Sequence, residues 1–219
     1  MTTIDLGKFK ELIEDGVLPK IKIAAVGGAG AKVVSYMWLT RGMRDEEFQG
    51  VDLIVTDCHA DTLILNKADT FIQLGKNLTK GLHSGGDSEI GQKAAEEARD
   101  VITQNLRGAD VVLIVAGMGG GTGTGASPIA ADCAKETGAL TIAVVIKPFK
   151  FEGQRKMEQA EAGIVKLEEH VDMLVTFSNE SVLQNHKLAC KSSIRDAFFR
   201  ADESIYRSVE TMVNYFTRP

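Results

Sequence analysis

The chain has 219 residues, with a hydrophobic fraction of 44% and a charged fraction of 25%, values that are ordinary for one sizeable globular domain. The net charge of −5 and the pI of about 5.5 argue against a general surface for nucleic acid or anionic membrane. The three cysteines lack redox or metal spacing, and the sequence has no signal peptide or apolar run of membrane-spanning length, so we expect a cytoplasmic protein without direct membrane insertion.

Short β-branched runs alternate with longer stretches of helical period along the chain. The predicted strands are Ile21–Val26, Asp52–Thr56, Thr70–Leu74, Asp110–Ala116, Leu140–Ile146 and Asp172–Phe177. The predicted helices are Lys8–Glu14, Ala31–Arg41, Glu89–Leu106, Thr124–Thr137, Glu152–His170 and Ser192–Phe216. This order predicts an α/β domain over residues 1–219: a doubly wound, mainly parallel sheet with helices on both faces and a long C-terminal helix at 192–216. Residues 1–19 form an N-terminal helical extension to this predicted domain.

Glycine-rich loops follow several of the predicted strands, and the carboxyl ends of parallel strands form the ligand edge of such a sheet. The richest loop is "AGMGGGTGTGASP", which begins at Ala116 and runs directly into a predicted helix. Glycines let backbone N–H groups curl around an anion, and the helix N-terminus adds a partial positive charge. A tight turn alone needs one or two glycines, so this loop predicts a phosphate site.

Two common phosphate motifs do not fit this loop. A Walker A loop requires a lysine, and none occurs between Gly117 and Ala134. The dinucleotide fingerprint should lie after the first strand, where "VGGAGAKVV" has Val33 in place of the third glycine. Two glycine loops on one sheet edge instead suggest a triphosphate that is held from two sides.

The segment "GGGTGTG" after a strand resembles the signature of the tubulin and FtsZ superfamily, and "AGMGGGTGTGASPIAA" is most similar to its FtsZ branch. The resemblance extends through "NLTKGLHSGGDSEIG", "IKPFKFEGQRKM" and "RDAFFRAD" to the terminal "TRP". It implies a Rossmann-like domain that binds GTP or GDP, with Mg²⁺ carried by the nucleotide phosphates and no metal ligand from the protein. The expected nucleotide contacts are Gly27, Gly28, Gly30, Ala31, Lys32, Ser84, Gly85, Gly86, Gly117, Gly119, Gly120, Gly121, Thr122, Gly123, Thr124, Gly125, Pro148, Glu152, Lys156, Asn179, Phe198 and Asp202.

The spacing of Phe198 and Asp202 places a ring and a carboxylate on one face of the last predicted helix. A purine could stack on Phe198 while Asp202 accepts from guanine N1–H and N2–H₂, a pair of donors that adenine lacks. By the resemblance, Asn179 is a second base contact, Glu152 a ribose contact and the loop Ser84–Gly86 a sensor of the γ-phosphate.

The sequence departs from the family pattern at several positions. Lys32 stands where the family usually has asparagine, Lys156 where it has arginine, and Asp57-Cys58-His59 where it has Asn-Thr-Asp. The pair Cys58–His59 has too few neighbours of ligand type for a metal site, and we do not expect it to be a nucleophile.

FtsZ proteins continue past the point where this chain ends, into an acidic loop that completes a neighbouring subunit's site and into a second domain. We therefore expect either an isolated nucleotide domain or a short relative, with catalytic residues unknown. A second apolar stripe on the last helix (Phe199, Tyr206 and Val213) predicts cover by a further domain, by self-association or by a partner subunit.

The sequence is compatible with three functions. One is GTP hydrolysis of FtsZ type, very slow for this chain alone because an acid from another chain is needed. The second is a non-hydrolysing guanine-nucleotide switch or scaffold. The third, a dinucleotide oxidoreductase, is disfavoured by the incomplete fingerprint.

Overall fold

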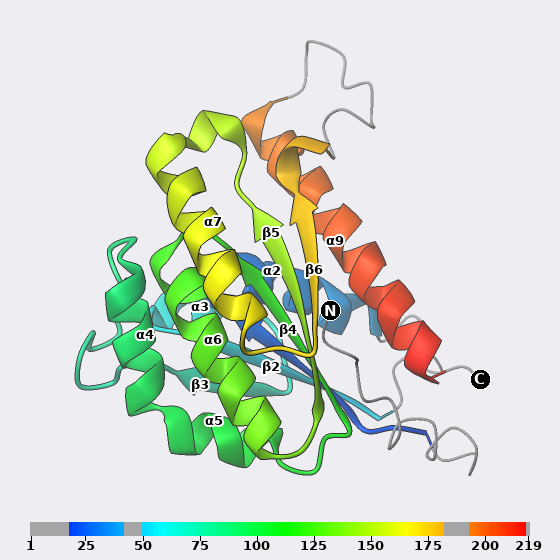
Figure 1. Cartoon of the computed structure of the whole chain (residues 1–219). Coiled ribbons are helices and arrows are strands. Elements are labelled where there is room, and N and C mark those ends of the chain that lie inside the picture. The colour runs from blue at the N-terminus through cyan, green and yellow to red at the C-terminus, as the bar shows by residue number, and fades with distance from the viewer. Residues whose placement is uncertain (1–17, 42–49, 182–192, 218–219) are drawn as a thin grey trace.

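Six parallel strands form the centre of the computed structural model, which describes residues 18–41, 50–181 and 193–217 (Figure 1). The strands are β1 (Ile21–Val26), β2 (Val51–Asp57), β3 (Thr70–Gln73), β4 (Val111–Gly117), β5 (Leu140–Lys147) and β6 (Met173–Ser178). Their order across the sheet is β3-β2-β1-β4-β5-β6, so the winding direction reverses between β1 and β4. The predicted doubly wound parallel sheet is confirmed.

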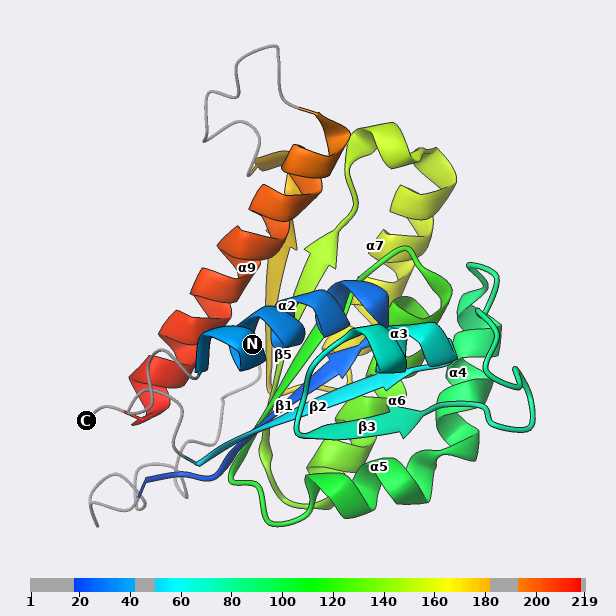
Figure 2. The same ribbon diagram turned by 180° about the vertical axis from the view of Figure 1, so that it is seen from behind.

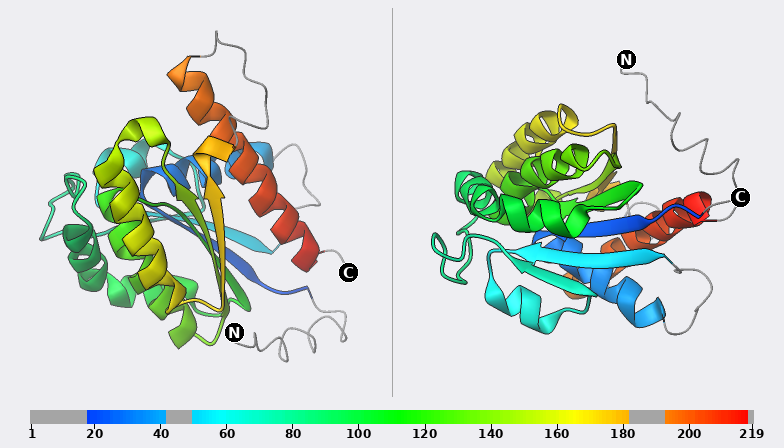
Figure 3. Two further views of the ribbon diagram at one scale, coloured as in Figure 1. Left: turned by 45° about the horizontal axis from the view of Figure 1, so that its top comes forward. Right: turned by 90° about the horizontal axis from the view of Figure 1, so that it is seen from below.

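The central strands consist almost entirely of Val, Ile, Leu and Ala because both of their faces are covered. In β4 the first six residues are all buried, as expected for a strand between two layers of helices. Figure 3 shows these layers, with the sheet between two sets of helices. The predicted strands therefore match the observed ones to within one or two residues at their ends.

The helices divide into two sets that pack on opposite faces of the sheet. One set is α4 (Ser88–Glu97), α5 (Arg99–Leu106), α6 (Gly121–Glu136) and α7 (Gln154–Glu168), and its core contains the even-numbered residues of β4. The other set, seen from behind in Figure 2, is α2 (Gly27–Arg41), α3 (Ala60–Leu65) and α9 (Ile194–Thr217). A short 3-10 turn, η1 (Lys150–Glu152), precedes α7.

Several predicted helix boundaries are wrong. Helix α2 begins at Gly27 rather than Ala31, and α6 begins at Gly121 rather than Thr124, so the glycines form the first helical turns rather than loops before them. The helix predicted over Glu89–Leu106 is broken at Ala98, whose φ of −98° and ψ of 7° end α4. Helix α3 was not predicted, since six residues are too few to show a period, and the helix predicted at Lys8–Glu14 lies outside the described residues.

The second apolar stripe of α9 is largely covered within the chain, contrary to the prediction. Tyr206 and Val213 are buried, and the Tyr206 ring meets Tyr36 of α2 edge-on at 4.7 Å between centroids. Phe199 is the member of the stripe that is exposed. Helix α2 supplies the cover that we had assigned to another domain or subunit, because α9 crosses it on the same face of the sheet (Figure 2).

Candidate functional site

A cavity of about 680 Å³ opens at the carboxyl ends of the strands, where the winding direction of the sheet reverses. Residues from the loops after all six strands line it, together with two side chains of α9. This is the position at which doubly wound sheets bind their ligands. Of the expected contacts, the structure brings together Gly27, Gly28, Lys32, Ser84, Gly85, Gly86, Gly117, Gly120, Gly121, Thr122, Gly123, Pro148, Glu152, Lys156, Asn179, Phe198 and Asp202.

The strand order arranges these residues from one end of the cavity to the other. Phe198, Asp202 and Asn179 belong to α9 and to the end of β6, at one edge. The glycine loop after β4 lies in the middle, and the residues after β2 and β3 lie at the opposite edge. The cavity therefore has an aromatic and amide end, a glycine-rich centre and a far end beside β2 and β3.

The backbone of the glycine loop after β4 has a conformation that would let a ligand approach it closely. Gly119 has a φ of +91°, and Gly120 is extended just before α6 begins. A Cβ atom at Gly120 would meet nothing within 4 Å, so that position faces open space in the cavity wall. This arrangement leaves the first N–H groups of α6 without intrahelical acceptors, as an anion site requires.

Five expected contacts, Gly30, Ala31, Gly119, Thr124 and Gly125, do not line the cavity. A Cβ at Gly30 would lie 2.1 Å from the Val115 carbonyl oxygen, and one at Gly125 would lie 1.9 Å from that of Ser88. These two glycines let helices approach neighbouring backbone closely. Ala31 is fully buried, and the Gly119 N–H donates to Thr124 Oγ1 at 2.8 Å. The structure thus gives these five residues packing and loop-shaping roles.

The loop Ser84–Gly86 lies against the glycine loop. Ser84 is buried, with its Oγ 3.4 Å from Thr122 Oγ1, whereas Gly85 and Gly86 are exposed with positive φ. The side-chain amide of Gln159 donates to the Gly86 carbonyl at 3.0 Å and lies 3.2 Å from the carbonyls of Gly119 and Gly120. One side chain of α7 therefore holds both loops.

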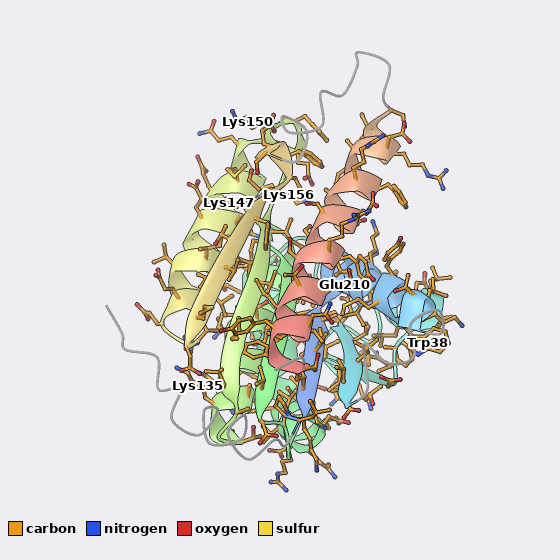
Figure 4. All side chains as sticks on the ribbon, turned by 90° about the vertical axis from the view of Figure 1, so that its right-hand side faces the viewer. Trp38, Lys135, Lys147, Lys150, Lys156 and Glu210 are labelled. Carbon is orange, nitrogen blue, oxygen red and sulfur yellow. The ribbon has the colours of Figure 1, made fainter. Side chains whose placement is uncertain are left out.

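At the ribose position expected from the resemblance, Glu152 and Lys156 form an ion pair with each other. Glu152 also accepts from the Phe149 N–H at 2.8 Å, which closes the turn before α7. Figure 4 shows Lys156 with Lys147 and Lys150 at the end of the molecule where β5 and β6 end, opposite Lys135. Both carboxylate oxygens of Glu152 thus have partners inside the chain, so a ribose hydroxyl would share the carboxylate with them.

The aromatic end of the cavity carries two polar groups, the Asn179 carboxamide and the Asp202 carboxyl. Asn179 is 7% exposed, and its Oδ1 atom is buried without a hydrogen bond. Burial raises the pKa of Asp202 to about 6, and the nearby Lys32 ammonium opposes this shift. The Phe198 ring is half-buried and meets the rings of Phe149 and Phe151 edge-on, at 5.1 Å and 6.0 Å between centroids. A buried acceptor without a hydrogen bond is costly, so a ligand with hydrogen-bond donors would be stabilised at this end of the cavity.

Sequence reasoning did not include six lining residues among the expected contacts: Ala29, Asp57, Thr62, His83, Met118 and Ile146. Asp57 is buried and ends β2, and its Oδ1 accepts from Thr122 Oγ1 at 3.0 Å and from the His59 N–H at 3.2 Å. Its place directly after a strand was a usable signal. Gln159 was also missed, because its role depends on where α7 packs.

Metal and thiol chemistry find little support in the described part of the chain. No cluster of three or more His, Cys, Asp or Glu side chains there could hold a metal ion. Cys58 is fully buried, and burial raises the pKa of its thiol, which disfavours the nucleophilic thiolate. None of the described helices is long and apolar enough to cross a membrane.

Known proteins of one family match most of this chain. Residues 20–187 match the family model described as "Tubulin/FtsZ family, GTPase domain". An FtsZ dimer from M. jannaschii superposes with a TM-score of 0.85 at 36% identity, over 97% of this chain and 60% of that one. The chain thus spans less than two thirds of the length of that FtsZ.

Two more distant structures share the fold. CetZ2 from Haloferax volcanii, solved as a GTPγS-bound protofilament, is 22% identical with a TM-score of 0.78, over 89% of this chain and 58% of that one. CetZ1 from the same organism, solved as a GDP-bound monomer, is 24% identical with a TM-score of 0.77, over 90% of this chain and 60% of that one.

Proposed function

Because the chain belongs to the tubulin/FtsZ family of GTPase domains, we propose that it binds GTP and GDP in the cavity at the carboxyl ends of its strands. The observation that carries the proposal is the combination of a glycine-rich centre with two groups at one end: a buried Asn179 Oδ1 atom that has no hydrogen bond from the described residues, and the largely buried carboxyl of Asp202. The centre suits phosphate, and the end suits a base that carries donors.

In this proposal the guanine lies against Phe198, and Asp202 accepts from N1–H and N2–H₂. Asn179 Oδ1 is a buried acceptor without a hydrogen bond from any of the described residues. It gains its hydrogen bond from the nucleotide, which supplies the missing donor. The phosphates then extend along Gly120–Gly123 toward the loop Ser84–Gly86, where backbone N–H groups and the Ser84 hydroxyl line the cavity. Adenine would leave the Asp202 carboxylate facing an acceptor, which favours guanine.

Magnesium would enter with the nucleotide, neutralising phosphate charge. Asp57 fits such an ion: it lines the phosphate half of the cavity, and the hydrogen bonds from Thr122 and His59 engage its Oδ1 oxygen. Its second carboxylate oxygen can then hold the ion or one of its waters. Carboxylate and hydroxyl oxygens are ligands that Mg²⁺ accepts, usually through water.

Hydrolysis of GTP by this chain alone should be very slow. The carboxylates that line the cavity are Asp57, Glu152 and Asp202. Glu152 is occupied by Lys156 and the Phe149 N–H, and Asp202 lies at the base end. Among the described lining residues, Asp57 is therefore the one carboxylate left to orient a water beside the terminal phosphate, and orientation of the attacking water is worth several orders of magnitude in rate. We propose that an acid from another chain or domain completes the site, and that self-association of FtsZ type supplies it.

The alternative is a guanine-nucleotide switch or scaffold that does not hydrolyse GTP. It is favoured by the same scarcity of free acids beside the phosphate half of the cavity. The two functions share a site and differ only in turnover.

Titration of the nucleotide-free protein with GTP, GDP, ATP and NAD tests the proposal. Binding of both guanine nucleotides, with much weaker binding of ATP and NAD, is expected. Binding of NAD alone would return the function to a dinucleotide oxidoreductase. Phosphate release measured over a range of protein concentrations then separates the two guanine-nucleotide functions: a rate per molecule that rises with concentration indicates catalysis between chains, and no release at any concentration indicates a switch.

A further inference from the structure

Two histidine rings stack at the end of the cavity beside β2 and β3. The centroids of His59 and His83 are 3.5 Å apart, with an interplanar angle of 17°. His83 lines the cavity immediately before the loop Ser84–Gly86, whereas His59 lies two residues after the end of β2 and directly precedes α3. Neither residue was among the expected nucleotide contacts, and His59 stands where the family has an acid.

The strand order identifies which part of the nucleotide would reach this end. With the base between Phe198 and Asp202, beyond β6, the phosphate chain passes the glycine loop after β4. Its terminal phosphate then points toward the residues that follow β2 and β3. His83 therefore lies at the position of the γ-phosphate, which GTP has and GDP lacks.

The described lining residues offer little positive charge at that end. Their lysines are Lys32 and Lys156, and no arginine is among them. Lys156 pairs with Glu152, after β5. Lys32 acts on the carboxyl of Asp202 at the base end. Asp57 adds negative charge beside the terminal phosphate, so a donor is needed there. Imidazole retains at least one N–H donor in either protonation state.

His59 fixes the orientation of the His83 ring. Its own backbone N–H donates to Asp57 Oδ1 at 3.2 Å, and its Nε2 lies 3.6 Å from Asp61 Oδ2. The Ala60 N–H donates to the Gly81 carbonyl at 3.0 Å, which joins the two loops next to the stacked rings. His83 is exposed and lines the cavity, and its ring has a defined partner and hence a defined direction.

We propose that His83 is a ligand of the terminal phosphate that sets the preference for GTP over GDP, and that His59 is the positioning residue that holds its ring by stacking. The proposal rests on the proposed guanine-nucleotide function. It adds a side-chain contact to a loop whose glycines offer only backbone.

Matched phenylalanine variants separate the donor from the stack. His83→Phe keeps a flat ring against His59 but removes the ring nitrogens and with them the N–H donor. His59→Phe also keeps a flat ring and leaves His83 intact. We expect His83→Phe to weaken GTP about tenfold, the scale of one lost hydrogen bond to a charged group, with GDP affinity unchanged within about twofold. His59→Phe should bind both nucleotides as the unmodified chain does, and His59→Ala should lose part of the preference for GTP.

Calorimetric titrations with GTP and GDP, in Mg²⁺ and in EDTA, measure these ratios, and circular dichroism checks the fold of each variant. A GTP-specific loss in His83→Phe that persists in EDTA supports the proposal. Equal GTP and GDP affinities in the two phenylalanine variants, or a loss of GTP affinity that appears only with Mg²⁺, would overturn it. If the unmodified chain binds neither GTP nor GDP, the proposed function fails instead; if it binds both and His83→Phe matches it, only this inference fails.

Discussion

The hydroxyl of Thr122 donates to the buried carboxylate of Asp57 across 3.0 Å. Thr122 lies in the first turn of α6 and Asp57 ends β2, so this hydrogen bond joins the central glycine loop to the far end of the cavity. The same hydroxyl lies 3.4 Å from Ser84 Oγ, which extends the connection to the loop after β3. Three separate segments of the phosphate half are thus tied through one threonine.

Replacing Thr122 by valine keeps the shape of the side chain but leaves Asp57 short of a donor. A buried carboxylate that loses a hydrogen bond costs about 1–3 kcal/mol, so we expect the free energy of unfolding to fall by that amount and nucleotide affinity to fall with it. Urea denaturation and nucleotide titration measure the two effects. Thr211→Val is the control, because its exposed hydroxyl bonds only to the Arg207 carbonyl within α9. Equal effects at both positions would mean that the Asp57 contact is unimportant.

Substitutions at Gly120 and Gly123 should act by different routes. A side chain at Gly120 would enter open space in the cavity wall, whereas a Cβ at Gly123 would lie 2.2 Å from the Gly117 carbonyl oxygen. We expect Gly120→Val to abolish nucleotide binding with a nearly native melting temperature, and Gly123→Val to lower that temperature strongly. Thermal melts by circular dichroism and nucleotide titration distinguish the two. A Gly120→Val protein that still binds GTP tightly would show that the loop does not hold the phosphates.

The affinity for GTP should depend on the charge of Asp202. Burial raises the pKa of this carboxyl to about 6, above its ordinary value of 3.8. The guanine N1–H and N2–H₂ groups need the ionised form, so affinity should be constant well above pH 6 and should fall below it, by up to about tenfold per pH unit. Since a raised pKa favours protonation in the folded state, the unliganded protein should gain stability from this group as pH falls from about 6 toward 3.8.

Asp202→Asn is the control for this pH dependence. The amide does not titrate, so the slope of GTP affinity between pH 8 and pH 5 should flatten. Its N–H₂ can donate to the 2-oxo group of xanthine, so XTP should gain relative to GTP. Unchanged GTP affinity in the variant at pH 8 would remove Asp202 from the base site.

Loss of the Gln159 side chain should loosen both glycine loops. Its amide lies within 3.2 Å of the carbonyl oxygens of Gly86, Gly119 and Gly120. At about 0.5–1.5 kcal/mol for each hydrogen bond, we expect Gln159→Ala to weaken GTP by about five- to tenfold without a change in base preference. Gln154→Ala on the same helix is the control, because that amide bonds only to Glu158. Equal affinities for the two variants would contradict a role for Gln159 in holding the loops.

The fold could be predicted because each strand of this sheet has a recognisable pattern in its own stretch of sequence. β4 and β5 are continuous apolar runs, and a glycine loop after such a run has few interpretations. Phe198 and Asp202 could be paired because helical spacing is fixed. The sequence does not show how one helix packs against another. This packing places α2 over Tyr206 and lets Gln159 reach both the loop Ser84–Gly86 and the glycine loop after β4. The stacking of His59 on His83 joins residues 24 positions apart by number, and no local pattern reports it.

The glycines of α6 divide the site into a part that resists change and a part that permits it. Gly125 lies against Ser88 of α4, and a Cβ at Gly163 of α7 would meet the Thr124 side chain at 2.2 Å, so α6 is enclosed by backbone and side chains on several sides. Nearly every residue from Gly121 to Ala134 is buried. Helix α9, by contrast, carries two large hydrophobic side chains, Phe199 and Tyr215, that are exposed. During divergence, substitutions in α9 could therefore change which base is accepted. The first turns of α6, which we propose hold the phosphates, tolerate almost no change of side chain.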